Sequence, residues 1–116
     1  MTRPLVAAGA INAAIAVAAG AFAAHGLRSR LDARALEVFE TGARYQMYHA
    51  LAMVLCGVLA MTRPGWTFQA GIVLFSGSLY ALALTDVKVL GAITPLGGLA
   101  FLAGWVWLAV SALRAS

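Results

Sequence analysis

The chain has 116 residues, of which 63% are hydrophobic and 10% are charged. Soluble domains carry about 25% charged and about 45–50% apolar residues, so this composition excludes an ordinary soluble domain. The net charge of +4 reflects a few arginines without acidic partners, so the sequence predicts no nucleic-acid partner and no disordered tract. A single cysteine, Cys56, cannot form an intrachain disulfide or a thiolate metal site. These features predict a small all-α membrane protein with several spans.

Four apolar segments are each long enough to cross a bilayer as a helix, which takes about 20 residues. They cover residues 5–24, 45–61, 66–84 and 95–113. Because the apolar runs are continuous rather than alternating, they favour helices over strands. We expect one domain, residues 1–116, folded as a polytopic four-helix transmembrane bundle.

The first segment also resembles a signal peptide, because Arg3 precedes it and the small-residue triplet at positions 21–23 could be a cleavage site. Its length, together with Gly9 and Asn12 inside it, favours a retained membrane span.

Residues 25–44 form the interfacial segment between the first two spans. Asp32 is expected to cap a helix that begins at Ala33. The apolar residues that follow have helical spacing, and Glu40 and Arg44 are spaced for a modest ion pair. This amphipathic loop helix lies in the membrane interface or runs directly into the second span. A plain solvated connector is the alternative.

The charges leave the membrane orientation open. Four spans place the two termini and the turn after the second span at one end, with Arg3, Arg63 and Arg114 and no acid. The other end has more basic residues but also all the acids. Counting Lys and Arg alone puts that other end in the cytoplasm, whereas net charge favours the end with the termini.

Polar side chains gather toward one membrane face, because successive helices alternate in direction. Such side chains at membrane depth usually point into the bundle or a wet cavity. We therefore predict an interhelical polar pocket near one interface, with the opposite half of the bundle devoted mainly to packing. The candidate ligand-binding residues are His25, Tyr45, Gln46, His49, Ser76, Tyr80 and Thr94.

The same residues also have structural interpretations. Tyrosines anchor spans at interfaces, serines bond to their own helix, and a histidine can bond a nearby carbonyl. Asn12, alone in the opposite half, is expected to bond across to a neighbouring helix. Small residues that let helices approach closely are expected at Gly20, Gly97, Gly98 and Gly104.

Four blocks across nearly the whole chain resemble the YgdD-like small inner-membrane proteins, a family catalogued as a domain of unknown function. The blocks are GAFAAHGL at 20–27, TGARYQMYHAL at 41–51, LFSGSLY at 74–80, and TPLGG with FLAGW at 94–98 and 101–105. The resemblance implies a four-helix protein of the bacterial inner membrane with both termini in the cytoplasm. The chain departs from the family in having four arginines in its first loop and Ala23 in place of a glycine. The resemblance brings no activity, substrate or cofactor.

Several function classes are compatible with these patterns. The first is a non-enzymatic membrane subunit or accessory protein that packs against itself or a membrane partner. All four acids lie in connecting segments, so we expect no catalytic carboxylate pair, no metal site and no cofactor. The alternative is a protein that binds a lipophilic small molecule, such as a quinone or a lipid headgroup, in the polar pocket. Transport, and haem ligation by His25 and His49, are further hypotheses.

Overall fold

The computed structural model describes residues 1–115 and consists of helices joined by short turns. The elements are α1 (Arg3–Phe22), the π-helical turn η1 (Ala23–Leu27), α2 (Ala33–Val58), α3 (Thr62–Ile72), the π-helical turn η2 (Val73–Gly77), α4 (Ser78–Thr85), the 3-10 turn η3 (Lys88–Ala92) and α5 (Thr94–Ala115). Since α3, η2 and α4 follow one another without a break, they form one helical rod, residues 62–85, which we call the third rod. The chain therefore makes four rods, as the four apolar segments predict.

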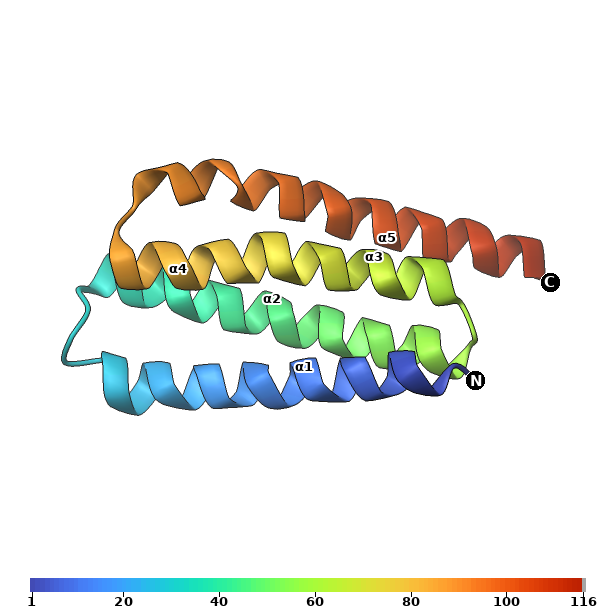
Figure 1. Cartoon of the computed structure of the whole chain (residues 1–116), viewed down its shortest axis with the longest axis horizontal. Helices are drawn as coiled ribbons and strands as arrows, with labels where there is room; N and C mark the ends of the chain where they lie inside the picture. Colours follow the sequence, from blue (N-terminus) through green and yellow to red (C-terminus); the bar gives the residue numbers. More distant parts are fainter. Residues whose placement is uncertain (116) are drawn as a thin grey trace.

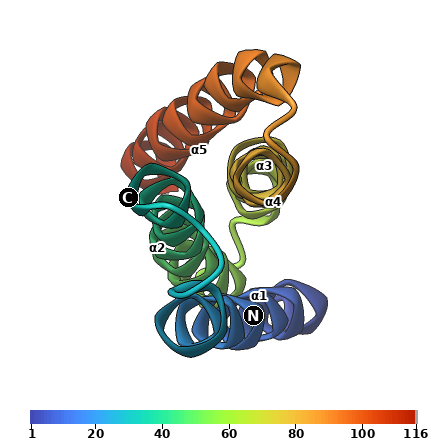
Figure 2. The ribbon, with the colours of Figure 1, turned by 90° about the vertical axis from the view of Figure 1, so that its left-hand side faces the viewer.

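The rods run antiparallel to their neighbours in sequence, so both ends of the chain lie at the same end of the molecule (Figure 1). Seen from the opposite end, α2 and the third rod form a central pair, with α1 on one side and α5 on the other (Figure 2). We call the end with the α1–α2 and α4–α5 connections the loop end, and the other the terminal end. The molecule measures 50 × 26 × 17 Å. Its longest dimension exceeds the thickness of a bilayer with its headgroups, about 40–45 Å.

Within residues 1–115, three rods are long and apolar enough to cross a membrane. They are Arg3–Leu27, Thr62–Thr85 and Lys88–Ala115. The remaining rod, α2, has 26 residues, but its first half is rich in charged and polar side chains. Of the four spans predicted from the sequence, three correspond to apolar rods, and the second corresponds to the amphipathic rod α2.

Residues 33–44 do not form a separate loop helix. Asp32 caps the helix as expected, because its carboxylate accepts a hydrogen bond from the Ala35 N–H at 2.8 Å. From Ala33 the helix then continues without interruption to Val58. The amphipathic segment is therefore the first half of α2: the expected helix start at Ala33 is confirmed, and of the two expected placements the segment runs directly into the second apolar run.

The turn between α2 and the third rod lies before residues 62–65, the gap between the second and third apolar segments. Ala60 adopts a left-handed conformation (φ 58°), and the Met61 N–H bonds the Cys56 carbonyl at 2.8 Å. Thr62 already begins α3, and Pro64 lies in its first turn, where its missing N–H leaves no bond unmade. This places Arg63 at the terminal end of the bundle.

Two apolar clusters fill the interior, one toward each end. The cluster of the terminal end contains Leu5, Ala52, Met53, Cys56, Phe68, Ile72 and Phe101. The cluster of the loop end contains Ala23, Leu27, Phe39 and Ala83. Between them the bundle is polar, as described below.

Glycines set the distance between α1 and α2. A Cβ added at Gly9 would lie 2.8 Å from the Ala50 carbonyl oxygen and from the Val54 backbone nitrogen. One added at Gly57 would lie 2.8 Å from the Val6 backbone nitrogen. The two backbones therefore touch, which only small residues permit.

Aromatic rings and glycines interlock the third rod with α5. The Phe101 ring covers Gly71 and the Phe68 ring covers Gly104, while Gly97 lies against the backbone of Phe75. Gly97 and Gly104 therefore lie at close helix contacts. A Cβ at Gly20 would meet nothing within 4 Å and one at Gly98 only a ring atom at 4.0 Å, so these two are not close-packing positions.

The α1–α2 crossing yields a stability prediction. Gly9→Ala places a methyl group against rigid backbone and should lower the free energy of unfolding by about 1–3 kcal/mol. Gly20→Ala, the matched control on the same helix, meets open space and should raise it by up to about 1 kcal/mol because alanine favours helix. Denaturant titration in detergent micelles followed by circular dichroism measures both. Equal effects at the two positions would contradict the close crossing.

Candidate functional site

A chain of side-chain hydrogen bonds crosses the middle of the bundle and joins three rods. The Tyr80 hydroxyl donates to Gln46 Oε1 at 2.7 Å, and Gln46 Nε2 donates to Asn12 Oδ1 at 3.1 Å. Asn12 Nδ2 in turn donates to Gln69 Oε1 at 2.8 Å and to the Ala8 carbonyl at 2.9 Å. We call Tyr80, Gln46, Asn12 and Gln69 the polar chain.

The polar chain runs lengthwise through the bundle, from Tyr80 in α4 toward the loop end to Gln69 in α3 toward the terminal end. Gln46 is close to the centre of α2, because that helix begins at Ala33. Asn12, which was expected to stand alone in a packing half, bonds to Gln46 and Gln69. The expected bond from Asn12 to a neighbouring helix is confirmed, but the internal polar residues are not confined to one half of the bundle, which corrects the prediction of an opposite half devoted mainly to packing.

His49 is held by bonds at both ring nitrogens. Its Nδ1 lies 2.8 Å from the Tyr45 carbonyl, and Trp105 Nε1 lies 3.0 Å from its Nε2. Because an indole N–H can only donate, Nε2 accepts and the proton is on Nδ1. The imidazole also stacks on Phe101, with ring centroids 3.5 Å apart. His49 is thus a neutral, buried packing residue that links α2 to α5.

The hydroxyl residues make a separate link. Ser78 Oγ and Thr94 Oγ1 lie 2.6 Å apart and join α4 to the start of α5. Ser76 is fully buried, and its Oγ is the one buried side-chain polar atom without a hydrogen-bond partner among residues 1–115. It lies in the π-helical turn η2.

The structure does not bring all predicted pocket residues together. His25 is exposed in η1 near the loop end, whereas His49 is buried near mid-length, so the two do not converge on a shared ligand. Tyr45 is 39% exposed and packs its ring on Phe75, with centroids 4.9 Å apart. Within the predicted set only the Gln46 and Tyr80 side chains bond to each other. His49 and Thr94 make separate bonds, Ser76 has no hydrogen-bond partner, and His25 and Tyr45 are exposed.

Two members of the site were missed in the sequence. Gln69 is an amide inside an apolar segment, which is itself a signal, because such a side chain needs a partner at membrane depth. Trp105 appears near the middle of the last segment rather than at an interface, where tryptophan is enriched. Only the tertiary structure pairs Trp105 with His49.

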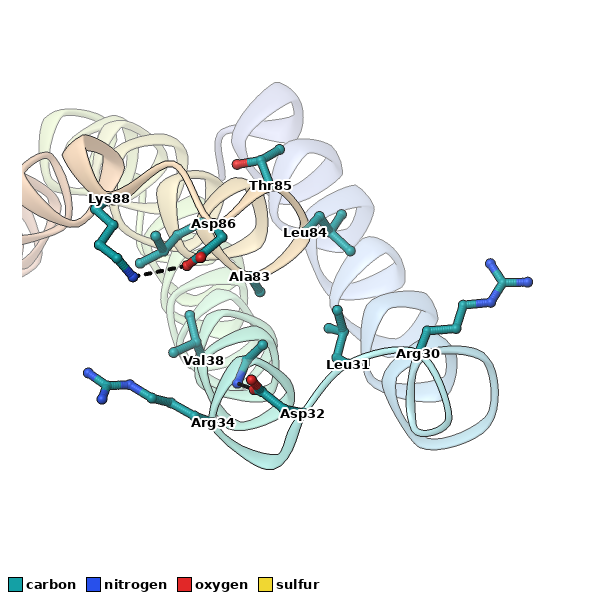
Figure 3. Close-up of a pocket in the computed structure, with 12 residues that line it drawn as sticks. Arg30, Leu31, Asp32, Arg34, Val38, Ala83, Leu84, Thr85, Asp86 and Lys88 are labelled. Carbon is teal, nitrogen blue, oxygen red and sulfur yellow. Dashed lines mark hydrogen bonds and ion pairs between the residues drawn. The ribbon is translucent and has the colours of Figure 1, made fainter.

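An open hollow of about 690 Å³ lies at the loop end, between the start of α2 and the end of α4. Leu31, Val38 and Ala83 are among its apolar lining residues, and Arg30 and Arg34 stand on its rim with side chains that extend outward (Figure 3). Lys88 pairs with Asp86 at 3.2 Å across the same rim. None of the seven predicted pocket residues lines this hollow.

The polar side chains of the site link the helices to one another. Amides and a tyrosine hydroxyl are consumed by bonds to one another, and both nitrogens of His49 are occupied. Among residues 1–115 no group of three or more His, Cys, Asp or Glu side chains could hold a metal ion.

A double-mutant cycle tests the polar chain. Gln46→Leu leaves the Tyr80 hydroxyl and the side-chain oxygen of Asn12 without their hydrogen-bond partner, and Tyr80→Phe removes only the hydroxyl. Hydrogen bonds between membrane helices contribute about 0.6 kcal/mol on average and up to about 1.7 kcal/mol. The two substitutions should therefore be non-additive by about that amount in the free energy of unfolding. Additive effects would mean that the two groups do not interact.

Nitrogen-15 NMR of histidine-labelled protein tests the His49 geometry. The expected spectrum has a protonated Nδ1 and an unprotonated Nε2 that is shifted by its bond from Trp105. Trp105→Phe keeps an aromatic ring but removes the donor, so the Nε2 resonance should move toward that of an imidazole without that bond. The exposed His25 is the internal control and should not shift. An unchanged His49 spectrum would contradict the bond.

The chain is similar to a known protein family and to several bacterial membrane proteins. Residues 19–98 match the family described as "Protein of unknown function (DUF423)". The UPF0382 membrane protein YwdK of Bacillus subtilis (strain 168) is 49% identical over 114 residues, which cover 91% of this chain and 93% of the relative. The UPF0382 membrane protein SAB0533 of Staphylococcus aureus (strain bovine RF122 / ET3-1) is 47% identical over 112 residues, with 91% and 92% coverage. No solved structure matches the chain.

These relatives are membrane proteins by name, and they align along almost their whole length. The family resemblance of the four sequence blocks is thereby confirmed, and the chain belongs to the DUF423 family of membrane proteins.

Proposed function

We propose that this protein is a non-enzymatic membrane subunit, whose internal polar residues hold its helices in register and whose outer surface contacts a partner. The observation that carries the proposal is the polar chain, in which the buried amides of Asn12 and Gln46 bond within the bundle. Groups that already bond one another offer little to a substrate.

The proposed topology is four spans with both termini in the cytoplasm, in a bacterial cell membrane. α2 connects the loop end of α1 to the terminal end of the third rod. If those two rods cross the membrane, α2 must cross it as well. The terminal end carries Arg3, Arg63 and Arg114 and, within residues 1–115, no acid. The basic excess of the loop end is smaller than the sequence suggests, because Arg44 lies within α2 near mid-length and not in a loop.

A lipophilic ligand is the second candidate, and the hollow at the loop end supports it. The apolar lining residues Leu31 and Val38 lie beside Arg30 and Arg34, and the lining also includes Lys88 and the carboxylates of Asp32 and Asp86. An amphiphile with a phosphate headgroup has matching chemistry, because arginines bind phosphate oxygens well. On this alternative the ligand site is the hollow and not the polar chain.

Purification in native lipid discs, followed by mass spectrometry of the proteins and lipids retained, distinguishes the two candidates. A subunit should retain a protein partner or a further copy of itself in fixed ratio. Tyr80→Phe, which removes one internal hydroxyl, should lower thermal stability and leave the retained molecules unchanged.

The contrary results are equally specific. A monomer without a protein partner that holds a lipid or quinone stoichiometrically would overturn the subunit proposal. Loss of that molecule in Arg30→Gln/Arg34→Gln would place it in the hollow, and its loss in His49→Ala, with helicity intact, would place it among the predicted pocket residues.

A further inference from the structure

The Gln69 end of the polar chain carries two hydrogen-bond donors that the bundle does not use. Asn12 Nδ2 bonds the Ala8 carbonyl at 2.9 Å, and because a carbonyl can only accept, this Asn12 atom is the amide nitrogen. The same nitrogen donates to Gln69 at 2.8 Å, so Gln69 turns its oxygen toward Asn12 and its Nε2 away from it. That nitrogen, with two N–H groups, has no hydrogen-bond partner among residues 1–115.

The Gln69 amide nitrogen reaches the outside of the bundle. Gln69 is half-buried, and its Nε2 is not an enclosed atom, because Ser76 Oγ is the one enclosed side-chain polar atom without a partner in the described part of the chain. About one turn away on the same rod lie Trp66 and Val73, whose side chains are 42% and 61% exposed. One side of the third rod is left uncovered by the other three rods (Figure 2). Gln69 thus offers its donors at an apolar surface.

A further donor lies beside Gln69. Trp66 is three residues earlier in the same helix, and side chains at that spacing are neighbours. An indole N–H can only donate, and within residues 1–115 Trp105 is the one tryptophan whose N–H has a partner. Trp66 and Gln69 therefore present three N–H groups without acceptors on adjacent turns.

The depth of these donors follows from the start of the third rod. Arg63 is exposed at the terminal end and forms no ion pair in the described residues, so its guanidinium is free to meet lipid phosphates. Trp66 and Gln69 lie about 4.5 Å and about 9 Å further along the helix. Each headgroup layer of a bilayer is about 5–8 Å thick. With Arg63 among the headgroups, Trp66 and Gln69 lie on the two sides of the boundary with the hydrocarbon core, where phospholipid ester groups are found.

We propose that Trp66 and Gln69 bind the ester carbonyls of one diacyl phospholipid on the lipid-facing side of the third rod. Ester carbonyls are acceptors without donors of their own, which is what the three N–H groups lack. From the surface inward, Arg63, the N–H groups and Val73 meet phosphate, ester and acyl chain in the order in which the lipid presents them. This lipid site is separate from the loop-end hollow and does not depend on the subunit function.

A phospholipid fits this place better than a partner helix. The backbone carbonyls of a transmembrane helix are already bonded within that helix, so a partner would need a polar side chain at the same depth. Such side chains are rare in membrane spans. Every diacyl phospholipid, by contrast, brings two ester carbonyls to this level.

Replacing ester lipids by ether lipids tests the contact without changing the protein. Dialkyl phosphatidylglycerol lacks the carbonyl oxygens but keeps the headgroup and chain length of the diacyl lipid. In native mass spectrometry with equal amounts of both, the wild-type protein should retain the diacyl lipid about ten-fold more, the ratio expected for one or two hydrogen bonds. Equal retention of the two lipids would overturn the proposal.

Substitutions locate the preference for the ester lipid. Trp66→Phe keeps the ring but removes one donor and should lower the preference, and Trp66→Phe/Gln69→Met should abolish it. Trp107→Phe is the matched control, because Trp107 is also 42% exposed and lies in α5, and it should keep the preference. Circular dichroism checks that each variant is folded. A preference that survives in the double variant would place the lipid elsewhere and refute this site.

Solid-state nitrogen-15 NMR tests the contact directly. The chain contains two glutamines, and Gln46, which is buried and bonded on both sides, is the internal control. In frozen phosphatidylglycerol bilayers with carbon-13 ester carbonyls, the Gln69 side-chain nitrogen should show a dipolar contact to the lipid, and that of Gln46 should show none. A contact of Gln69 with water, or with a carbonyl-labelled quinone added to the bilayer, in place of the ester would overturn the proposal. Neither result bears on the subunit function, which is decided by the proteins retained in lipid discs.

Discussion

Polar groups inside a bilayer have no water to bond with, and this constraint organises the whole bundle. Asn12, Gln46, Gln69 and Tyr80 come from three rods, and each has a partner only when the rods are in one register. A shift of one helix by a turn would leave several buried polar atoms without hydrogen-bond partners at once. The polar chain therefore specifies one arrangement of helices whose apolar surfaces would otherwise pack in several ways.

Close approach of the backbones makes these bonds possible. Short side chains such as Asn12 reach a neighbouring helix only if the helix axes are near each other, and Gly9 and Gly57 bring α1 and α2 into contact. On the opposite side, Gly71 and Gly104 receive the rings of Phe101 and Phe68, and the same rings enclose His49. Close packing at the glycines therefore brings the helices near enough for their polar side chains to bond.

The rod α2 differs from the others because both of its faces carry polar groups. Its inner face supplies Gln46 and His49, which are satisfied within the chain, while its outer face carries Glu40 and Arg44, which form no ion pair in the described residues. The inner face of α2 thus holds the bundle together, and its outer face carries charges on the surface of the bundle. These charges also explain why α2 falls short of the apolarity of the other rods.

The sequence by itself determined the helical class, the number of rods, the cap at Asp32 and the family, because apolar run length and local capping are properties of neighbouring residues. It also pointed to Gln46, His49 and Tyr80 as polar residues inside the bundle, because polar side chains at membrane depth usually point inward, but it grouped them with His25 and Tyr45, which are exposed. Only the tertiary structure decided that the helix from Ala33 continues without a break to Val58. It alone showed that Gln69 bonds to Asn12 and Trp105 to His49, and that His25 and Gly20 lie outside these contacts. Hydropathy reports how a residue partitions into lipid, but not which neighbour satisfies it. That pairing depends on the register and rotation of whole helices, which the fold alone sets.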